Sequence, residues 1–252
     1  MRIAFVIGAI LSISTIVWSI WRVPELPLSP EQKAKLAAQK QGLKATLTEI
    51  WDAIREMPVP MRQMAWMKLF QWYGMMCYWI YIVPSLAKTV YGTSDATSMG
   101  FRDAGLLNGK IGGFYNFVAF VAAFAMVPFT RRLGAKWVHA FALSCAAVAM
   151  WMLPGIREKA WLFVPMLGIG LAWASIMGNP YVLLAGAIPP ERAGVYMGIF
   201  NMFIVLPMIV QMLTLPLFYD SMLNSDPRHV IQLAGCFLCI AAALTLRIKT
   251  ND

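Results

Sequence analysis

Charged residues are scarce in this sequence. Asp, Glu, Lys and Arg together make up 13% of the 252 residues, whereas hydrophobic residues make up 60%. Soluble domains carry about a quarter charged residues, and so few charges cannot cover a water-facing surface. The composition therefore excludes a soluble domain and predicts an integral membrane protein. The net charge of +9 does not indicate a nucleic-acid partner, because the basic residues cluster in loops beside hydrophobic runs, where they act as topology signals.

Acidic residues are absent from the middle of every long hydrophobic run. Asp95, Asp103, Asp220 and Asp226 fall in predicted loops on one side of the membrane, and Glu191 falls in a loop on the other. No Ser-His-Asp grouping, HExxH motif, Walker loop or cofactor fingerprint is present. The sequence therefore predicts no enzyme, no cofactor and no metal site. It also lacks the mid-membrane carboxylate that many ion-coupled transporters use.

Histidine and cysteine are also rare. His139 lies near the start of an apolar run and His229 lies in a loop beside Pro227 and Arg228, so we interpret both as solvated at the membrane interface. The four cysteines, Cys77, Cys145, Cys236 and Cys239, all fall in apolar runs. The last two have the spacing of a redox or metal motif but lack a basic neighbour and a second ligand pair. All four are therefore interpreted as small buried hydrophobic residues.

Seven apolar runs are long enough to cross a bilayer, which needs roughly 17–25 residues in a helix. They are Ile3–Trp21, Trp66–Leu86, Leu107–Phe129, Trp137–Leu153, Trp161–Ile188, Val195–Tyr219 and Val230–Leu246. The predicted fold is an all-α membrane protein. Its predicted parts are a transmembrane helix (1–21), a cytoplasmic linker with surface helices (22–61), a six-helix bundle (62–249) and a cytoplasmic tail (250–252).

The linker and the basic residues set the predicted topology. A helix is expected to open at Ser29, and a second, amphipathic helix covers Leu47–Met57. Placing the linker in the cytoplasm gives that side roughly twice as many Lys and Arg residues as the other, with Lys68 included in the count. The C-terminus is then cytoplasmic and the N-terminus outside, which suggests that residues are missing upstream.

Polar aromatic and amide side chains are concentrated in four of the runs. Sugars combine hydroxyl groups with apolar C–H faces, so proteins hold them with aromatic platforms and with amide and phenol groups. Candidate substrate-binding residues are Gln71, Trp72, Trp79, Tyr115, Asn116, Trp173, Asn179, Tyr181, Asn201 and Gln211. Trp72 and Trp79 are seven residues apart and share a helix face.

Two of the amide side chains could instead have a structural role. Asn201 could be a contact between helices at the small-residue face of Gly194 and Gly198, and Gln211 could satisfy backbone groups freed by Pro207 or Pro216. The runs at 137 and 230 carry little polarity, so we expect them to face lipid. The runs at 66, 107, 161 and 195 are expected to face a polar interior.

Several motifs together resemble a known family. They are QWYGMMCYWIY (71–81), YGTSD (91–95) with DAG (103–105), WASIMGNPY (173–181) and PPERAGVYMGIFN (189–201). These stretches resemble the C-terminal six-helix half of a major facilitator superfamily transporter. Within it they are similar to the sucrose/proton symporters and the bacterial maltose and α-glucoside transporters of the glycoside–cation symporter group. TRRLGAK (130–136) resembles the superfamily's basic loop but lacks its Asp.

The resemblance implies a fold and a function. Ile3–Trp21 would be the sixth of twelve helices, and the seventh, eighth, tenth and eleventh would surround the substrate. The chain would be the C-terminal half of a symporter in the cytoplasmic membrane that moves a disaccharide, such as maltose or sucrose, with a proton by alternating access. It would need an N-terminal half, in the same longer chain or as a separate subunit, and be inactive alone. The competing interpretation is a complete seven-span scaffold, sensor or subunit that does not transport.

Overall fold

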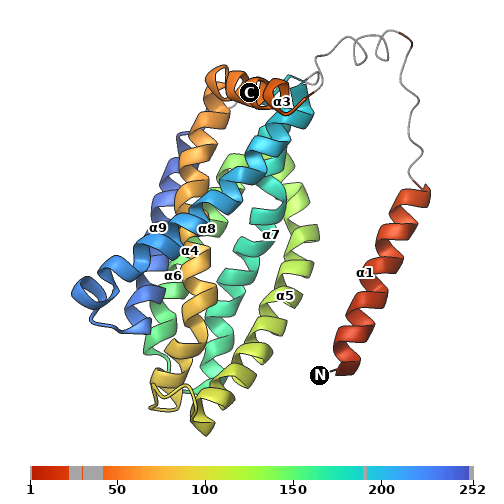
Figure 1. The fold of residues 1–252 in the computed structure, drawn as a ribbon. Helices are drawn as coiled ribbons and strands as arrows, with labels where there is room; N and C mark the ends of the chain where they lie inside the picture. The colour runs from red at the N-terminus through yellow and green to blue at the C-terminus, as the bar shows by residue number, and fades with distance from the viewer. Residues whose placement is uncertain (1, 23–29, 31–41, 190–191, 250–252) are drawn as a thin grey trace. The chain divides into compact units, whose positions relative to one another are not determined.

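The computed structural model describes residues 2–22, 30, 42–189 and 192–249, which form helices and connecting turns without a strand (Figure 1). The long helices are α1 (Arg2–Arg22), α3 (Leu43–Arg55), α4 (Val59–Val90), α5 (Met99–Leu133), α6 (Ala135–Met152), α7 (Phe163–Ala185), α8 (Ala193–Leu223) and α9 (Pro227–Leu246). Two short 3-10 helices, η1 (Leu153–Gly155) and η2 (Lys159–Leu162), join α6 to α7. Each of the seven predicted spans coincides with a helix. The helix predicted to open at Ser29 lies outside the described residues.

The chain divides into two compact units, residues 1–49 and residues 50–252. The first unit contains α1, an apolar helix with no buried side chain among those described. The second unit begins within α3, whose last turn packs on the bundle through the buried side chain of Ala53, followed by buried Met57. The amphipathic helix predicted over 47–57 is therefore present as α3.

Six of the described helices are long and apolar enough to cross a membrane: α1, α5, α6, α7, α8 and α9, the α6 and α7 spans including η1 and η2. α4 has 32 residues and is long enough, but its Gln, Trp and Tyr side chains reduce its mean hydropathy. It lies between α9, α8 and α5 and is packed along most of its length. α4 therefore has the polarity of an interior helix.

The remaining helices pack around α4 in an uneven way. α6 lies between α7 and α9, and α5 packs on α7, whereas α8 packs mainly on α4 (Figure 1). About half of the apolar segment is buried in α6 (56%) and α9 (44%), against 22% in both α5 and α8. In this unit, α5 and α8 therefore leave the most surface uncovered.

Two glycines in α7 allow neighbouring helices to approach closely. A Cβ atom at Gly168 would lie 2.6 Å from the backbone oxygen of Cys145 in α6. A Cβ atom at Gly170 would lie 2.6 Å from the backbone oxygen of Tyr115 in α5. Close backbone approach through small residues is a main source of helix association in lipid. These glycines therefore determine how near α5 and α6 lie to the centre of the bundle.

Gly170→Ala is expected to destabilise the bundle, because the added methyl meets backbone atoms that cannot move aside locally. The expected loss is about 1–3 kcal/mol, the usual range for overpacking. Gly178→Ala in the same helix is the matched control, since nothing lies within 4 Å of its Cβ position. Thermal unfolding in detergent micelles measures both. Equal melting temperatures for the two variants would show that the α5–α7 approach is not tight.

Candidate functional site

Three indole rings meet in the middle of the bundle. Trp72 and Trp79 come from one face of α4, with ring centroids 6.1 Å apart. Trp173 of α7 lies edge-on to both, 6.4 Å from Trp72 and 5.6 Å from Trp79. Trp72 is buried, and its indole N–H has no hydrogen-bond partner. The tryptophan cluster (Trp72, Trp79 and Trp173) therefore combines an aromatic wall with an unused donor.

A chain of hydrogen bonds runs beside this cluster through four helices. Thr130 of α5 donates to Asn179 Oδ1 of α7 at 3.1 Å, and Asn179 Nδ2 donates to Ser175 Oγ at 2.8 Å. Ser175 Oγ lies 2.9 Å from Nδ1 of His139 in α6. His139 Nε2 lies 3.0 Å from Gln71 Oε1 of α4. This polar chain links residues that are far apart in the sequence.

The polar chain has a direction. Gln71 Oε1 can only accept, so Nε2 of a neutral His139 carries the hydrogen and Nδ1 accepts from Ser175. Every donor from Thr130 onward then points toward α4. The last group, Gln71 Nε2, is buried without an acceptor. The polar chain therefore ends in an unused N–H donor at the centre of the bundle.

Lys68 lies one turn before Gln71 on the same face of α4 and is fully buried. Its Nζ has no hydrogen-bond partner and no ion pair among the described residues. Aromatic rings surround it instead: Nζ is 3.9 Å from the ring centroid of Phe200, 5.5 Å from that of Tyr181 and 5.8 Å from that of Trp72. Trp72 thus contacts Lys68 as well as the other two tryptophans of the cluster.

These aromatic contacts do not offset the burial of an ammonium group. A cation–π contact contributes about 0.5–2 kcal/mol. Removing an ion from water still costs several kcal/mol after the protein relaxes. A paired carboxylate would reduce that cost, and none of the described carboxylates pairs with Lys68. Lys68 therefore has no counter-ion among the described residues to offset its burial.

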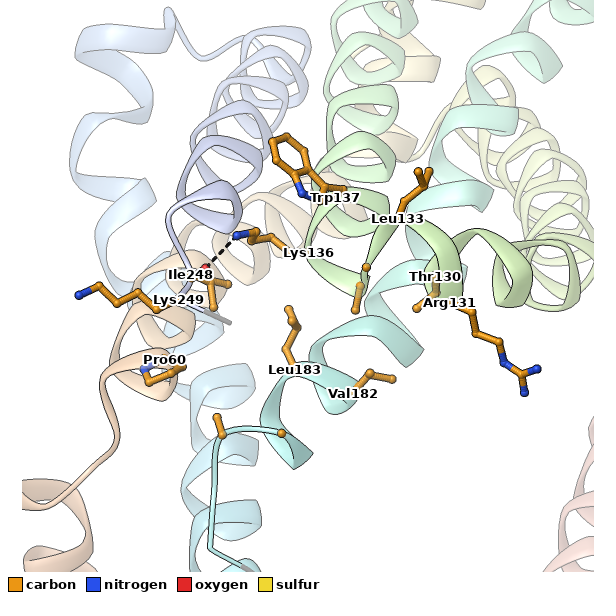
Figure 2. A pocket seen from close by; sticks show the side chains of 14 residues that line it. Pro60, Thr130, Arg131, Leu133, Lys136, Trp137, Val182, Leu183, Ile248 and Lys249 are labelled. Atoms are coloured by element: carbon orange, nitrogen blue, oxygen red, sulfur yellow. Dashed lines mark hydrogen bonds between the residues drawn. The ribbon is translucent and has the colours of Figure 1, made fainter. Parts of the chain in front are cut away.

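A pocket of about 340 Å³ opens at the end of the bundle where α5 meets α6 (Figure 2). Gly134, with a φ of +85°, separates these two helices there. Lys136 points at the carbonyl of Ile248, to which its Nζ donates at 3.2 Å. Thr130 lines the pocket and is the first member of the polar chain. The pocket therefore contacts the outer end of that chain.

Six of the ten predicted binding residues lie together. Gln71 and Asn179 belong to the polar chain, the three tryptophans form the cluster, and Tyr181 lies over Lys68. The other four are Tyr115, Asn116, Asn201 and Gln211, and within the described chain none of them has a hydrogen bond or ring contact with this group. Asn116 is exposed and donates to Gly112 of its own helix, and Asn201 is exposed on α8. Gln211 is buried on α8 with its Oε1 unpartnered.

The structure corrects several predictions. His139 is fully buried and belongs to the polar chain, so its predicted interfacial solvation is wrong, and α6 contributes to the interior. Lys68 is not a topology signal at a membrane edge, because it is buried. Cys236 and Cys239 are exposed on α9, so the prediction of burial is wrong for them. In the sequence, Lys68 lies on the same helical turn as Gln71 and Trp72, and this spacing could have indicated that Lys68 faces the interior.

An ion-pair cluster lies at the opposite end of the bundle, where α4 ends and α9 begins. Asp226 accepts from Lys88 Nζ at 2.9 Å and from the Arg228 guanidinium at 2.7 Å, and it caps α9 through the Arg228 backbone N–H. Burial alone would raise the pKa of Asp226, but the hydrogen bonds from Arg228 and Lys88 dominate and hold that pKa well below its usual range. Asp226 is therefore ionised across the physiological pH range and holds α4 to α9.

Apolar helices of membrane-spanning length around a polar centre define a multi-pass integral membrane protein. The family model of the Major Facilitator Superfamily matches residues 1–212, which is most of the chain. The chain therefore belongs to the major facilitator superfamily and is a membrane transporter of small molecules. No curated protein and no solved structure matches the chain.

His139→Leu is expected to destabilise the bundle, because it leaves Gln71 Oε1 and the Ser175 hydroxyl unpaired in the interior. Each buried group left without a partner costs about 1–3 kcal/mol. Ser144→Ala is the matched control, since Ser144 lies on the exposed side of the same helix and bonds only to its own backbone. Thermal unfolding in detergent compares the two. A loss no larger for His139→Leu than for Ser144→Ala would contradict the polar chain.

Asp226→Asn keeps a helix-capping side chain but removes the charge. Because the folded-state pKa is depressed, the contribution of Asp226 is fully present above the unfolded-state pKa of about 3.9 and is lost as the pH falls through the folded-state value. At pH 7 the free energy of unfolding of the variant is expected to be about 1–2 kcal/mol lower than that of wild type. This range allows for solvent screening at the partly exposed partners, Lys88 and Arg228. The difference in melting temperature from wild type should stay constant from pH 7 to about pH 5 and shrink in stronger acid.

Asp103→Asn is the control for this pH series, since Asp103 has no ion pair in the described structure. It removes the same formal charge from the same protein. A pH-independent difference for Asp226→Asn, or an equal loss in both variants, would contradict the assigned role.

Proposed function

We propose that this chain supplies the C-terminal, substrate-binding bundle of a sugar:cation symporter that takes an α-glucoside disaccharide such as maltose or sucrose. The observation that carries the proposal is the tryptophan cluster, in which Trp173 of α7 meets Trp72 and Trp79 of α4. Tryptophans of an aromatic belt lie at the membrane–water interface, whereas these three indoles pack edge to face inside the bundle. Their place beside buried polar groups favours a binding surface.

The chemistry of a sugar matches this surface. A pyranose ring presents apolar C–H groups that pack on indole faces, and a rim of hydroxyl groups that need hydrogen-bond partners. Gln71 Nε2 and Trp72 Nε1 are donors without acceptors beside the cluster. A sugar hydroxyl could accept from either while its ring packs on the indoles. The resemblance to sucrose and maltose symporters supports the same substrate class.

The site would be completed by a facing bundle. α5 and α8 carry the remaining four predicted residues and leave the most surface uncovered in residues 50–252. An N-terminal half against these helices would close the site and permit alternating access. No Asp or Glu lies in the middle of α4 to α9. The carboxylate that couples transport to a cation, which we take to be a proton, would then come from that half.

This assignment also orients the chain. The linker, the α5–α6 pocket and the C-terminus would lie in the cytoplasm, and the Asp226 ion pairs would lie on the far side of the cytoplasmic membrane. The cytoplasmic parts would be residues 22–61 and 250–252, with residues 62–249 forming the bundle.

Trp173→Ala, made in the transporter that contains both bundles, is expected to reduce uptake of labelled maltose or sucrose by at least about tenfold, because it removes one wall of the aromatic surface. Trp161→Ala is the matched control, since Trp161 is exposed at the end of the bundle. Membrane insertion of both variants is checked by immunoblot. Normal uptake in Trp173→Ala would refute the site. Failure of the wild type to move either sugar would refute the proposed substrate class.

A further inference from the structure

The α5–α6 pocket carries charge of one sign only. Three of its lining residues are basic and none is acidic: Arg131, Lys136 and Lys249. Neither Arg131 nor Lys249 has an ion pair among the described residues. Lys136 uses one of its three N–H groups on the carbonyl of Ile248, which leaves two for another acceptor. The charge of this pocket therefore suits an anion.

The first turn of α6 adds backbone donors to the same pocket. α6 begins directly after Gly134, which has no side chain to accept hydrogen bonds from the N–H groups of that turn. Residues 135–137 form the turn and all line the pocket. N–H groups at the start of a helix attract anions, phosphates in particular. Figure 2 shows Arg131 and Lys249 on opposite sides of the pocket, so that basic side chains flank these donors.

An apolar hollow of about 480 Å³ adjoins the pocket. Leu133 and Trp137 line both of them. The hollow lies between α5 and α6, which make few direct contacts with each other, and Leu171 of α7 also lines it. All its lining side chains are apolar, and they include Phe129 and Phe141, both exposed. In a membrane-spanning bundle, an exposed apolar surface of this kind faces acyl chains.

The pocket and the hollow together have the two parts of a lipid. Basic residues beside an apolar span by themselves only set topology. Here they border a pocket that adjoins an apolar hollow, and an anionic phospholipid likewise joins a negatively charged headgroup to apolar chains. We propose that the α5–α6 pocket and the apolar hollow bind one anionic glycerophospholipid. Its phosphate lies at Lys136 and the start of α6, and an acyl chain lies between α5 and α6.

This lipid site adjoins the interior of the bundle at Thr130. Thr130 lines the pocket and donates to Asn179, which is the first hydrogen bond of the polar chain. The headgroup therefore lies next to that chain, and the acyl chain fills a space that α5 and α6 leave between them. A ligand that binds only the folded state stabilises it, so the lipid is expected to raise the melting temperature. The inference does not depend on which solute is transported.

Two lipids with identical acyl chains test the headgroup part. The purified protein in detergent is titrated with phosphatidylglycerol, which is anionic, or with phosphatidylcholine, which has no net charge, and bound lipid is measured by native mass spectrometry. The wild type is expected to bind phosphatidylglycerol about tenfold or more tightly. Arg131→Gln combined with Lys136→Gln should remove most of this preference. Arg102→Gln combined with Lys110→Gln is the matched control, since both residues are exposed elsewhere on α5.

A second pair of variants tests the acyl-chain part. Ala125 lines the hollow, whereas Ala123 is exposed on the same helix and does not line it. Ala125→Phe fills the hollow and should weaken phosphatidylglycerol binding about fivefold or more, whereas Ala123→Phe should leave it unchanged. Glycerol 3-phosphate has the charged phosphate without acyl chains and should not displace the lipid. Phosphatidylglycerol should also raise the melting temperature of Ala123→Phe more than that of Ala125→Phe.

The folding of each variant is checked by its melting transition. If the Arg131 and Lys136 double variant does not fold, Arg131→Gln combined with Lys249→Gln takes its place. Neither of these two side chains has a hydrogen bond or an ion pair within the described chain, so their replacement leaves the bundle intact.

Every binding result bears on the lipid site. A phosphatidylglycerol preference that depends on the basic residues and on free space at Ala125 supports it. Equal affinity of the wild type for the two lipids, or a preference unchanged in the basic double variant, overturns it. Unchanged binding in Ala125→Phe overturns the acyl-chain part, and displacement by glycerol 3-phosphate then identifies a soluble phosphate as the occupant.

Discussion

The scarcity of water in the interior is the constraint on which this structure depends. A polar group in a membrane bundle must find a protein partner, and the Gln71–His139 hydrogen bond joins α4 to α6 for that reason. Ser175 and Asn179 extend the same linkage to α7, and Thr130 extends it to α5. Four helices are thereby fixed in register by side chains, in addition to the close approach at Gly168 and Gly170. Apolar packing alone would leave that register less well defined.

Against this background, the unpartnered groups at Lys68, Gln71 and Trp72 are exceptions. They lie where the polar chain and the tryptophan cluster meet, because Gln71 ends the chain and the next residue, Trp72, belongs to the cluster. The ring of Phe200 lies over Lys68 Nζ. Phe200 belongs to α8, which packs mainly on α4 and has fewer neighbouring helices in the described bundle than the others packed on α4. The unpartnered groups thus lie next to a helix that packs on few others in the described bundle.

The helices could be predicted because long apolar runs have few other solutions in lipid, and every predicted span is a helix. The pair Trp72 and Trp79 was predictable from its spacing of seven residues on one helix. Their contact with Trp173 was not, since spacing along one helix does not reveal which neighbour faces it. The burial of His139 was not predictable for the same reason: its partner Gln71 is 68 residues away in the sequence. The burial of Lys68 was not predictable either, because a single lysine near the end of a span is typical of a topology signal.

The polarity of α4 affects how the chain enters the bilayer. The translocation machinery releases a helix into lipid according to its apolarity, and α4 is the one span-length helix of the described bundle that is not apolar enough on its own. Its most extensive neighbour, α9, follows all the other described helices in the chain and is synthesised after them. α4 must therefore be retained, or held by α5, until later helices arrive, so that its integration is a cooperative event of assembly. The polar side chains of α4 thus link its integration into the membrane to the assembly of the bundle.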